Sequence, residues 1–270
     1  MEELKDFLQE SRNRKKDLSE NPAHIYHHLL QFMDHITERI SSTDQGIRLN
    51  AGIDAVDEIT GGLRLGELAI IGGDLGSGRT TLALHYAIQT AEEQRKPVWI
   101  YTREHSAHQI TVRLLSMITG VPIWTMEEGQ PTEEQWRRLM TAFLWLKEQD
   151  IRVYDVYMNL DDVCDNVQAQ GAPMLLIIDG ADPQMLDTNA LKMLGSMAKE
   201  MRCCVLLTNC RFPNADYIQG GVDKEFWLQR HGGGIHWLEL TWNRYGKNGE
   251  CDLRRRDDCL SFFQNPILDM

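Results

Sequence analysis

Residues 73–81, with the sequence GDLGSGRTT, constrain the fold of this chain more than any other segment. They follow an apolar run, Leu68–Ile71, that predicts a buried strand, and they open a helical pattern, Thr80–Gln94. Glycines at such a junction let backbone N–H groups turn inward around an anion, and the helix N-terminus adds partial positive charge. The segment predicts a phosphate-binding P-loop, with a ligand-free glycine turn as the alternative. Its binding residues would be Gly73, Gly76, Ser77, Gly78, Arg79, Thr80 and Thr81.

Arg79 stands where P-loops carry a lysine. Lysine puts a compact ammonium between the terminal phosphates, whereas arginine brings a larger planar fork on a longer stem. Phosphoryl transfer depends strongly on positioning. Two alternatives therefore stay open, a loop that supports hydrolysis and a loop that binds nucleotide without turnover.

Two carboxylates follow strands that come after the P-loop. Asp179 closes the apolar run Met174–Ile178, and Glu104 lies just past the predicted strand Val98–Tyr101. In open α/β sheets ligands bind at the carboxyl ends of the strands, so both side chains are expected near the P-loop. Asp179 and the hydroxyl of Thr80 are candidate Mg²⁺ ligands. Glu104 is a candidate general base, with an ordinary surface charge as the alternative.

Short apolar runs alternate with helical patterns from residue 46 onward. This predicts an α/β fold whose mostly parallel sheet has helices on both faces. The last runs lack helices between them and predict an antiparallel C-terminal ribbon. The predicted strands are Leu68–Ile71, Val98–Tyr101, Ile151–Tyr154, Met174–Ile178, Cys203–Leu207, Phe226–Leu228, Ile235–Trp242 and a strand near Leu260–Phe263. The predicted helices are Thr80–Gln94, Ala107–Thr119, Glu133–Gln149 and Asn189–Met201.

Two polar segments of the ribbon are predicted to be irregular. His231–Gly234 is predicted as a turn between two ribbon strands. The basic triplet Arg254–Arg256 is predicted as a loop whose charges pair with Asp257 and Asp258.

Residues 1–45 contain no glycine and are predicted to form a helical arm before a domain at 46–270. Asn21 before Pro22 is typical of a helix start, and apolar residues then recur every three or four positions. These residues are Ile25, Leu29, Phe32, Ile36 and Ile40. The stripe predicts a helix at 22–41 that docks on its own domain or on a neighbouring subunit.

Charge and composition exclude several classes of protein. The 270 residues include 28 Lys+Arg and 40 Asp+Glu, a net charge of −12, which excludes a uniformly basic nucleic-acid-binding surface but not a local patch. The longest clean apolar run, Pro173–Ile178, is far shorter than the ~18 residues of a membrane span, and the acidic N-terminus lacks a signal-peptide core. Cysteines without a CxxC pair are typical of reduced thiols. We expect a cytoplasmic protein with no membrane partner.

These motifs, in this order, resemble the C-terminal motor domain of DnaB-type replicative helicases. The stretches that carry the resemblance are GIDAVDEITGGLRLGELAIIGG at 52–73, YTREHSAHQITVRLL at 101–115, GVPIWTMEEGQPTEEQWRRL at 120–139, LLIIDGADPQ at 175–184 and LTWNRYGKNGE at 240–250. The resemblance implies a RecA-like P-loop NTPase with ATP and Mg²⁺ as cofactors. It implies an ATP-dependent DNA helicase or translocase that acts on single-stranded DNA in DNA replication. It also implies a ring-like hexamer whose linker helix, at 22–41, docks on the adjacent subunit.

The resemblance further implies roles for single residues. Glu104 would be the general base, and Thr80 and Asp179 would serve Mg²⁺. Arg244 would act in trans as an arginine finger on a neighbour's ATP. Asn209 stands where the family keeps a glutamine that senses the terminal phosphate.

The chain departs from the family pattern at several places. Arg79 replaces the P-loop lysine, Trp242 replaces a second basic residue beside Arg244, and the segments after Asp179 and Asn209 are short. The family grips DNA with loops from those regions, and RFPNADYIQGG at 211–221 offers only Arg211, so DNA binding is expected to be weak. No counterpart of the family's N-terminal helical domain is recognised.

Three functions therefore stay open. The first is a working, diverged motor. The second is an impaired, helicase-like nucleotide-binding subunit that docks on a replication partner. A recombination ATPase of the RadA or KaiC kind is the third, although residues 101–139 resemble the helicases more closely.

Overall fold

The computed structural model of the chain describes residues 25–26, 28–30, 33, 47–155, 159–182, 186–209 and 220–263. Contacts divide the chain into two compact units, Met1–Ile47 and Arg48–Met270. In the first unit the described residues between 25 and 33 are helical. Most of the predicted helix at 22–41 lies outside the described residues, so the helix and its docking role stay predictions.

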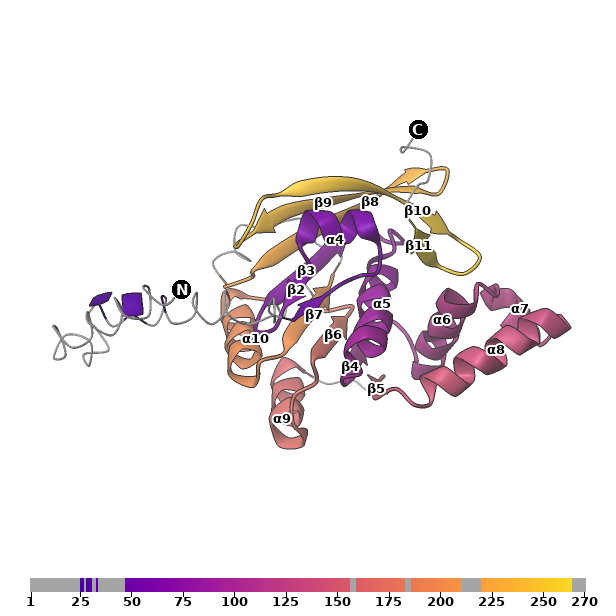
Figure 1. Ribbon diagram of the computed structural model, residues 1–270, viewed down its shortest axis with the longest axis horizontal. Coiled ribbons are helices and arrows are strands. Elements are labelled where there is room, and N and C mark those ends of the chain that lie inside the picture. The colour runs from indigo at the N-terminus through magenta and orange to yellow at the C-terminus, as the bar shows by residue number, and fades with distance from the viewer. Residues whose placement is uncertain are drawn as a thin grey trace, which may run out of the picture. The chain divides into compact units, whose positions relative to one another are not determined.

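The second unit is organised around one large sheet (Figure 1). Its strands are β3 (Leu68–Gly73), β4 (Val98–Thr102), β5 (Ile151–Tyr154), β6 (Leu175–Asp179), β7 (Cys204–Thr208), β8 (Lys224–Gly232), β9 (Ile235–Asn243), β10 (Gly249–Arg256) and β11 (Ser261–Phe263). They lie in the order β11-β10-β9-β8-β3-β7-β6-β4-β5. Strands β8, β3, β7, β6, β4 and β5, which follow one another in this order, pair parallel with each other. Strands β8 to β11 pair antiparallel. The predicted parallel sheet with an antiparallel C-terminal ribbon is confirmed.

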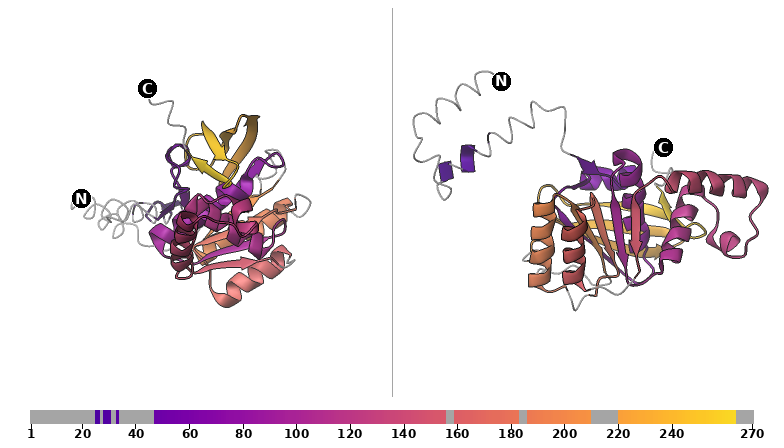
Figure 2. Two further views of the ribbon diagram at one scale, coloured as in Figure 1. Left: turned by 90° about the vertical axis from the view of Figure 1, so that its right-hand side faces the viewer. Right: turned by 90° about the horizontal axis from the view of Figure 1, so that it is seen from below.

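Helices cover both faces of the sheet. They are α4 (Asp54–Thr60), α5 (Arg79–Gln89), the π-helical turn η1 (Thr90–Gln94), α6 (Ala107–Thr119), α7 (Ile123–Glu127), α8 (Glu133–Leu146), α9 (Leu160–Gln170) and α10 (Thr188–Met201). A two-stranded sheet of β1 (Arg48–Leu49) and β2 (Leu63–Arg64) is separate from the large one. Helices α9 and α10 stand side by side on one face, and α6, α7 and α8 extend to one side of the unit (Figure 2).

The core follows from the alternation of side chains along the central strands. Leu68 and Ile70 of β3 join the apolar cluster that contains residues of α9 and α10. Ala69 and Ile71, which point to the opposite face, are fully buried where α5 packs on β3. Both faces of a parallel sheet must be covered in this way, which explains why its strands are continuous apolar runs.

Local sequence determines where several helices begin. Ser106 with Gln109 and Thr132 with Gln135 form capping boxes that start α6 and α8. Each box satisfies backbone N–H groups that the first helical turn leaves without partners. Because α6 starts at residue 107, only a short loop separates it from the end of β4, and Glu104 lies in this loop.

The structure corrects three expectations. The triplet Arg254–Arg256 is the end of strand β10, not a loop, because β10 pairs with both β9 and β11. The predicted turn at His231–Gly234 is shorter, since β8 continues through Gly232. The helix predicted as Thr80–Gln94 changes to a π-helical turn at Thr90. Strand β10 and helix α9 were not predicted, because charged residues interrupt their apolar patterns.

None of the described helices has both the length and the apolar character that crossing a membrane requires.

Candidate functional site

The P-loop connects the end of β3 to the start of α5 and depends on its glycines. A Cβ atom on Gly73 would lie 2.3 Å from the carbonyl oxygen of Leu228 in the neighbouring strand β8. Gly78, the residue before α5, has φ of +101°, and a Cβ atom there would lie 2.6 Å from Cζ of Phe262. A larger residue at either position would collide with neighbours that cannot easily move. The backbone of the loop is therefore closely enclosed by the sheet and its ribbon.

Arg79 is turned back onto its own loop. Its side chain is only 6% exposed, and its Nη1 donates a hydrogen bond to the carbonyl oxygen of Gly73 at 2.5 Å. Its Nη2 lies 3.9 Å from Oε1 of Glu104. The guanidinium of Arg79 thus joins the beginning of the P-loop to the carboxylate predicted as general base.

Asp179 lies at the carboxyl end of β6 and is almost completely buried. Its Oδ1 accepts hydrogen bonds from the hydroxyls of Thr80 at 2.7 Å and Thr208 at 2.8 Å. Its Oδ2 lies 3.1 Å from Nδ1 of His105 and accepts a longer bond from Thr102 at 3.3 Å. Burial raises the pKa of Asp179, but the hydrogen bonds outweigh burial and bring this pKa below its ordinary value. The carboxylate is therefore ionised and held against the first turn of α5.

Glu104 follows β4, and its side chain lies against Gly180, the residue after Asp179. A Cβ atom on Gly180 would come within 2.5 Å of Cγ of Glu104, so only glycine at this position lets Glu104 occupy its place. The side chain of Glu104 is 42% exposed, which leaves its carboxylate open to solvent beside the P-loop. The three elements that the sequence singled out, the P-loop, Glu104 and Asp179, come together at one edge of the sheet.

A cavity of about 250 Å³ opens at this edge. Sequence reasoning did not assign four of the residues that line it to this site: His105, Arg113, Arg255 and Leu260. Burial lowers the pKa of Arg113 below its ordinary value, and the nearby Asp179 offsets only part of this decrease. Arg113 had a signal in the sequence, since it lies on the helix that follows Glu104. Arg255 stood out only as part of a basic triplet, and nothing in the sequence placed it at the P-loop, because it reaches the loop through the order of the ribbon strands.

Asn209 and Arg244 lie at opposite ends of the parallel strands. Asn209 is buried just after β7, and its backbone N–H donates to the carbonyl oxygen of Ile71, two residues before the P-loop. Arg244 follows β9, and its Nε lies 2.8 Å from Oδ1 of Asp223, whose Oδ2 accepts from the backbone N–H of Leu68 at the start of β3. The ends of this strand are about 17 Å apart. Arg244 and the P-loop of the same chain therefore do not form one site.

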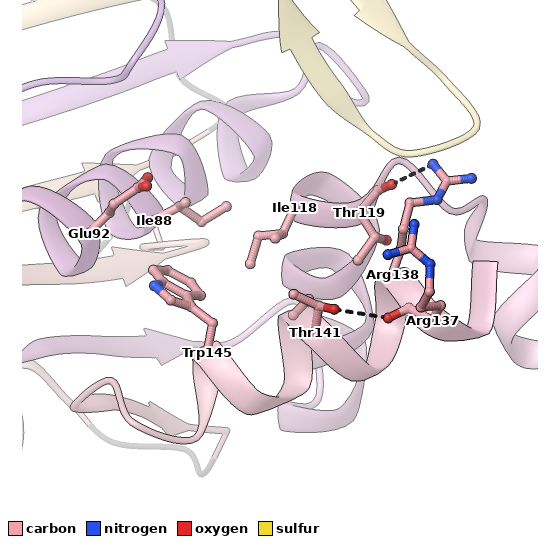
Figure 3. A pocket seen from close by; sticks show the side chains of 9 residues that line it. Ile88, Glu92, Ile118, Thr119, Arg137, Arg138, Thr141 and Trp145 are labelled. Atoms are coloured by element: carbon pink, nitrogen blue, oxygen red, sulfur yellow. Dashed lines mark hydrogen bonds between the residues drawn. The ribbon is translucent and has the colours of Figure 1, made fainter. Parts of the chain in front are cut away.

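A second concave surface lies between α5 with η1, α6 and α8 (Figure 3). We call it the α8 groove; its volume is about 420 Å³. It is lined by Ile88, Glu92, Ile118, Thr119, Arg137, Arg138, Thr141, Ala142 and Trp145. Beside it, α8 exposes an apolar stripe formed by Trp136, Met140, Phe143 and Leu144, of which Trp136 is 57% exposed. Exposed apolar residues gathered on one helix face are typical of a protein interface.

Comparisons with known proteins agree with this architecture. The chain is 30% identical over 162 residues to the replicative DNA helicase DnaB of Buchnera aphidicola subsp. Schizaphis graminum, a match that covers 57% of this chain and 34% of that protein. It is 28% identical over 133 residues to the DnaB helicase of Helicobacter pylori, covering 48% and 27%. The matched segments thus span about a quarter to a third of the length of these curated relatives.

Solved structures show the same fold. A DnaB-like replicative helicase, solved in a study of its interactions with primase, superposes with a TM-score of 0.73 at 17% identity, covering 87% of this chain and 66% of that chain. A second solved structure, an isolated ATPase domain, has a TM-score of 0.73 at 18% identity, covering 87% and 98%. The predicted RecA-like fold is confirmed. Residues 48–209, more than half of the chain, match the family described as the DnaB-like helicase C terminal domain, and the chain therefore belongs to this family.

Proposed function

We propose that this chain is an ATP-driven motor domain of a DnaB-type helicase that moves along single-stranded DNA in DNA replication. One observation carries the proposal: the hydroxyl of Thr80 meets the ionised carboxylate of Asp179 at 2.7 Å, with Glu104 open to the same cavity. A hydroxyl at the start of a helix, a buried carboxylate and an exposed carboxylate are among the groups that P-loop proteins use to hydrolyse a phosphate chain.

The residues at the cavity fit Mg²⁺ and ATP. Mg²⁺ uses one or two protein oxygens, several waters and the phosphates of its substrate, and Thr80 and Asp179 supply this number of oxygens. When bound, the ion neutralises the charge that develops on the phosphates. The backbone of Gly76 and Gly78 and the first turn of α5, including Thr81, would surround those phosphates.

Other residues have complementary roles in this proposal. Glu104 would accept a proton from the attacking water, and its partial exposure allows that water to enter. Asn209 would respond to the terminal phosphate. Arg244 would act on the nucleotide of a neighbouring subunit, and the ion pair with Asp223 would hold its guanidinium in place for that contact.

A ring-like hexamer follows from the same proposal. The apolar stripe of residues 22–41 would dock on the α8 groove and the exposed stripe of a neighbouring copy. Two features support this docking: Ile25 and Leu29 are 65% and 50% exposed, and the α8 stripe is itself exposed. Single-stranded DNA would pass through the ring and bind weakly. Of the short segments considered for DNA contact, residues 183–185 and 210–219, which include Arg211, lie outside the described residues.

A second candidate function is an impaired helicase-like subunit that binds nucleotide and docks on a replication protein. The contacts of Arg79 favour it. An arginine that is bonded to Gly73 and adjacent to Glu104 is not free to align a terminal phosphate, and it restrains the proposed base.

Steady-state hydrolysis of Mg²⁺-ATP, measured with and without single-stranded DNA, distinguishes the two functions. We expect turnover that DNA stimulates and that Glu104→Gln abolishes, while the control Glu128→Gln, at an exposed position after α7, retains it. Turnover no greater than that of Glu104→Gln would refute the motor and favour the impaired subunit.

A further inference from the structure

The C-terminal ribbon forms one wall of the P-loop cavity. Phe262 of β11 is 3% exposed, and its ring lies directly against the backbone of Gly78. The backbone N–H of Phe262 donates to Nε2 of His85 on α5 at 3.0 Å. Strand β11 lies beside α5 (Figure 1). The P-loop and the ribbon are therefore one packed structure, although about 180 residues separate them in the chain.

Arg255 extends from this ribbon to the P-loop. Its Nη1 donates to the carbonyl oxygen of Gly76 at 2.9 Å and would lie 3.4 Å from a Cβ atom on Gly78. Its Nε donates to Asp257 at 2.8 Å, and its side chain is only 10% exposed. A guanidinium held at both ends in this way has already lost most of its rotamer freedom, so little further ordering accompanies ligand binding.

The charge around the cavity contrasts with the charge of the chain. The chain as a whole has a net charge of −12. Among the described residues that line the cavity, Arg79, Arg113 and Arg255 are cations and Glu104 is the one carboxylate. Arginines concentrated in a cleft of an acidic protein favour an anionic ligand.

The three arginines are not equally placed to bind that ligand. Arg79 is engaged by Gly73 and faces Glu104. Arg255 donates one N–H of Nη1 to Gly76, and its Nε and Nη2 both contact Asp257, with Nη2 2.6 Å from Oδ1. These contacts use three of the five N–H groups of the guanidinium, so two remain for a ligand in the cavity that Arg255 lines. We propose that Arg255 is a nucleotide-binding residue that acts in cis. It contacts the phosphate chain and supplies the positive charge that Arg79, engaged by Gly73 and Glu104, does not bring to the phosphates. Asp257 is the positioning residue that orients Arg255. This inference rests on the proposed nucleotide-binding function.

The test is equilibrium binding of a fluorescent ATP analogue to the full chain with Mg²⁺, together with competition by inorganic tripolyphosphate, which has no base or sugar. We expect Arg255→Ala to weaken both ligands ~10- to ~100-fold, as the loss of charge-assisted hydrogen bonds would. Arg255→Lys should restore part of the affinity. Arg256→Ala, which removes the neighbouring and exposed guanidinium paired with Asp258, should stay within about 2-fold of the wild type.

Arg79→Ala gives the sharpest comparison. In an ordinary P-loop the cation of the loop dominates phosphate binding, whereas here we expect Arg255→Ala to weaken tripolyphosphate at least as much as Arg79→Ala does. If Arg255→Ala fails to fold by thermal unfolding, Arg255→Gln carries the same test, because its amide N–H can replace the Nε hydrogen bond to Asp257 without the charge.

The outcomes separate this inference from the proposed function. Wild-type binding that Thr80→Ala weakens and Arg255→Ala leaves unchanged overturns the role of Arg255 while the nucleotide site stands. Weaker ATP binding with unchanged tripolyphosphate binding also overturns it, since Arg255 would then contact the base. A wild-type chain that binds neither ligand overturns both the inference and the proposed function.

Discussion

Replacing Arg79 by lysine should raise ATP turnover if this arginine is the main restraint on the motor. In the structure the guanidinium donates to Gly73 at 2.5 Å and lies 3.9 Å from Glu104. A hydrogen bond from a charged group contributes about 1.5–3 kcal/mol. An ion pair with a partly exposed carboxylate contributes about 0–1 kcal/mol. These contacts must break before the cation can align a phosphate, so about 2 kcal/mol opposes the productive arrangement.

A lysine cannot make the same two-sided contact, because its ammonium is compact and its stem is shorter. Removing about 2 kcal/mol from the barrier corresponds to a ~30-fold increase in kcat. The assay is steady-state hydrolysis of Mg²⁺-ATP by Arg79→Lys, with Arg95→Lys as a control at an exposed position. Unchanged turnover in an Arg79→Lys protein that folds and binds ATP like the wild type would refute the reasoning.

Two further predictions concern the pH dependence of stability and the assembly of the ring. Burial lowers the pKa of His85 from 6.5 to about 4, so the unfolded chain binds more protons between these values and stability falls as pH decreases through this range. The loss of unfolding free energy amounts to about 3 kcal/mol. In urea unfolding, His85→Gln should show a flatter dependence of this free energy on pH over the same range. A pH profile parallel to that of the wild type would contradict the prediction. Deleting residues 1–45, or introducing Phe143→Asp on the exposed α8 stripe, should abolish self-assembly in light scattering. A truncated chain that still forms rings would refute the docking role of residues 22–41.

Much of the site could be located from the sequence because each component follows an apolar strand directly. The glycines after β3, Glu104 after β4 and Asp179 at the end of β6 are read from local patterns. Parallel strands bring their carboxyl ends to the same edge, so these residues had to meet once the α/β class was recognised. The roles assigned to Arg244 and Asn209 came from the resemblance alone, and they stay proposals.

Other features could not be read locally. Thr102 at the end of β4, His105 just after it and Thr208 at the end of β7 surround Asp179 from two different segments, and no spacing in the sequence relates them to it. The same holds for the direction of the Arg79 side chain. A hydrophobic pattern reports which face of an element is buried, but not which polar groups meet across the carboxyl edge of a sheet.

Local patterns of the chain were enough to predict the fold class, to locate the P-loop and to select the two carboxylates as candidates, because strand periodicity and glycine spacing are local properties. The position of Arg255 at this cavity, in contrast, depends on long-range packing. Sheet order places β8 beside β3, and β9, β10 and β11 follow outward from β8. Antiparallel pairing then returns residues 255 and 262 to the P-loop. That order depends on long-range backbone hydrogen bonds and on the packing of Phe262 against Gly78, which no local sequence pattern encodes.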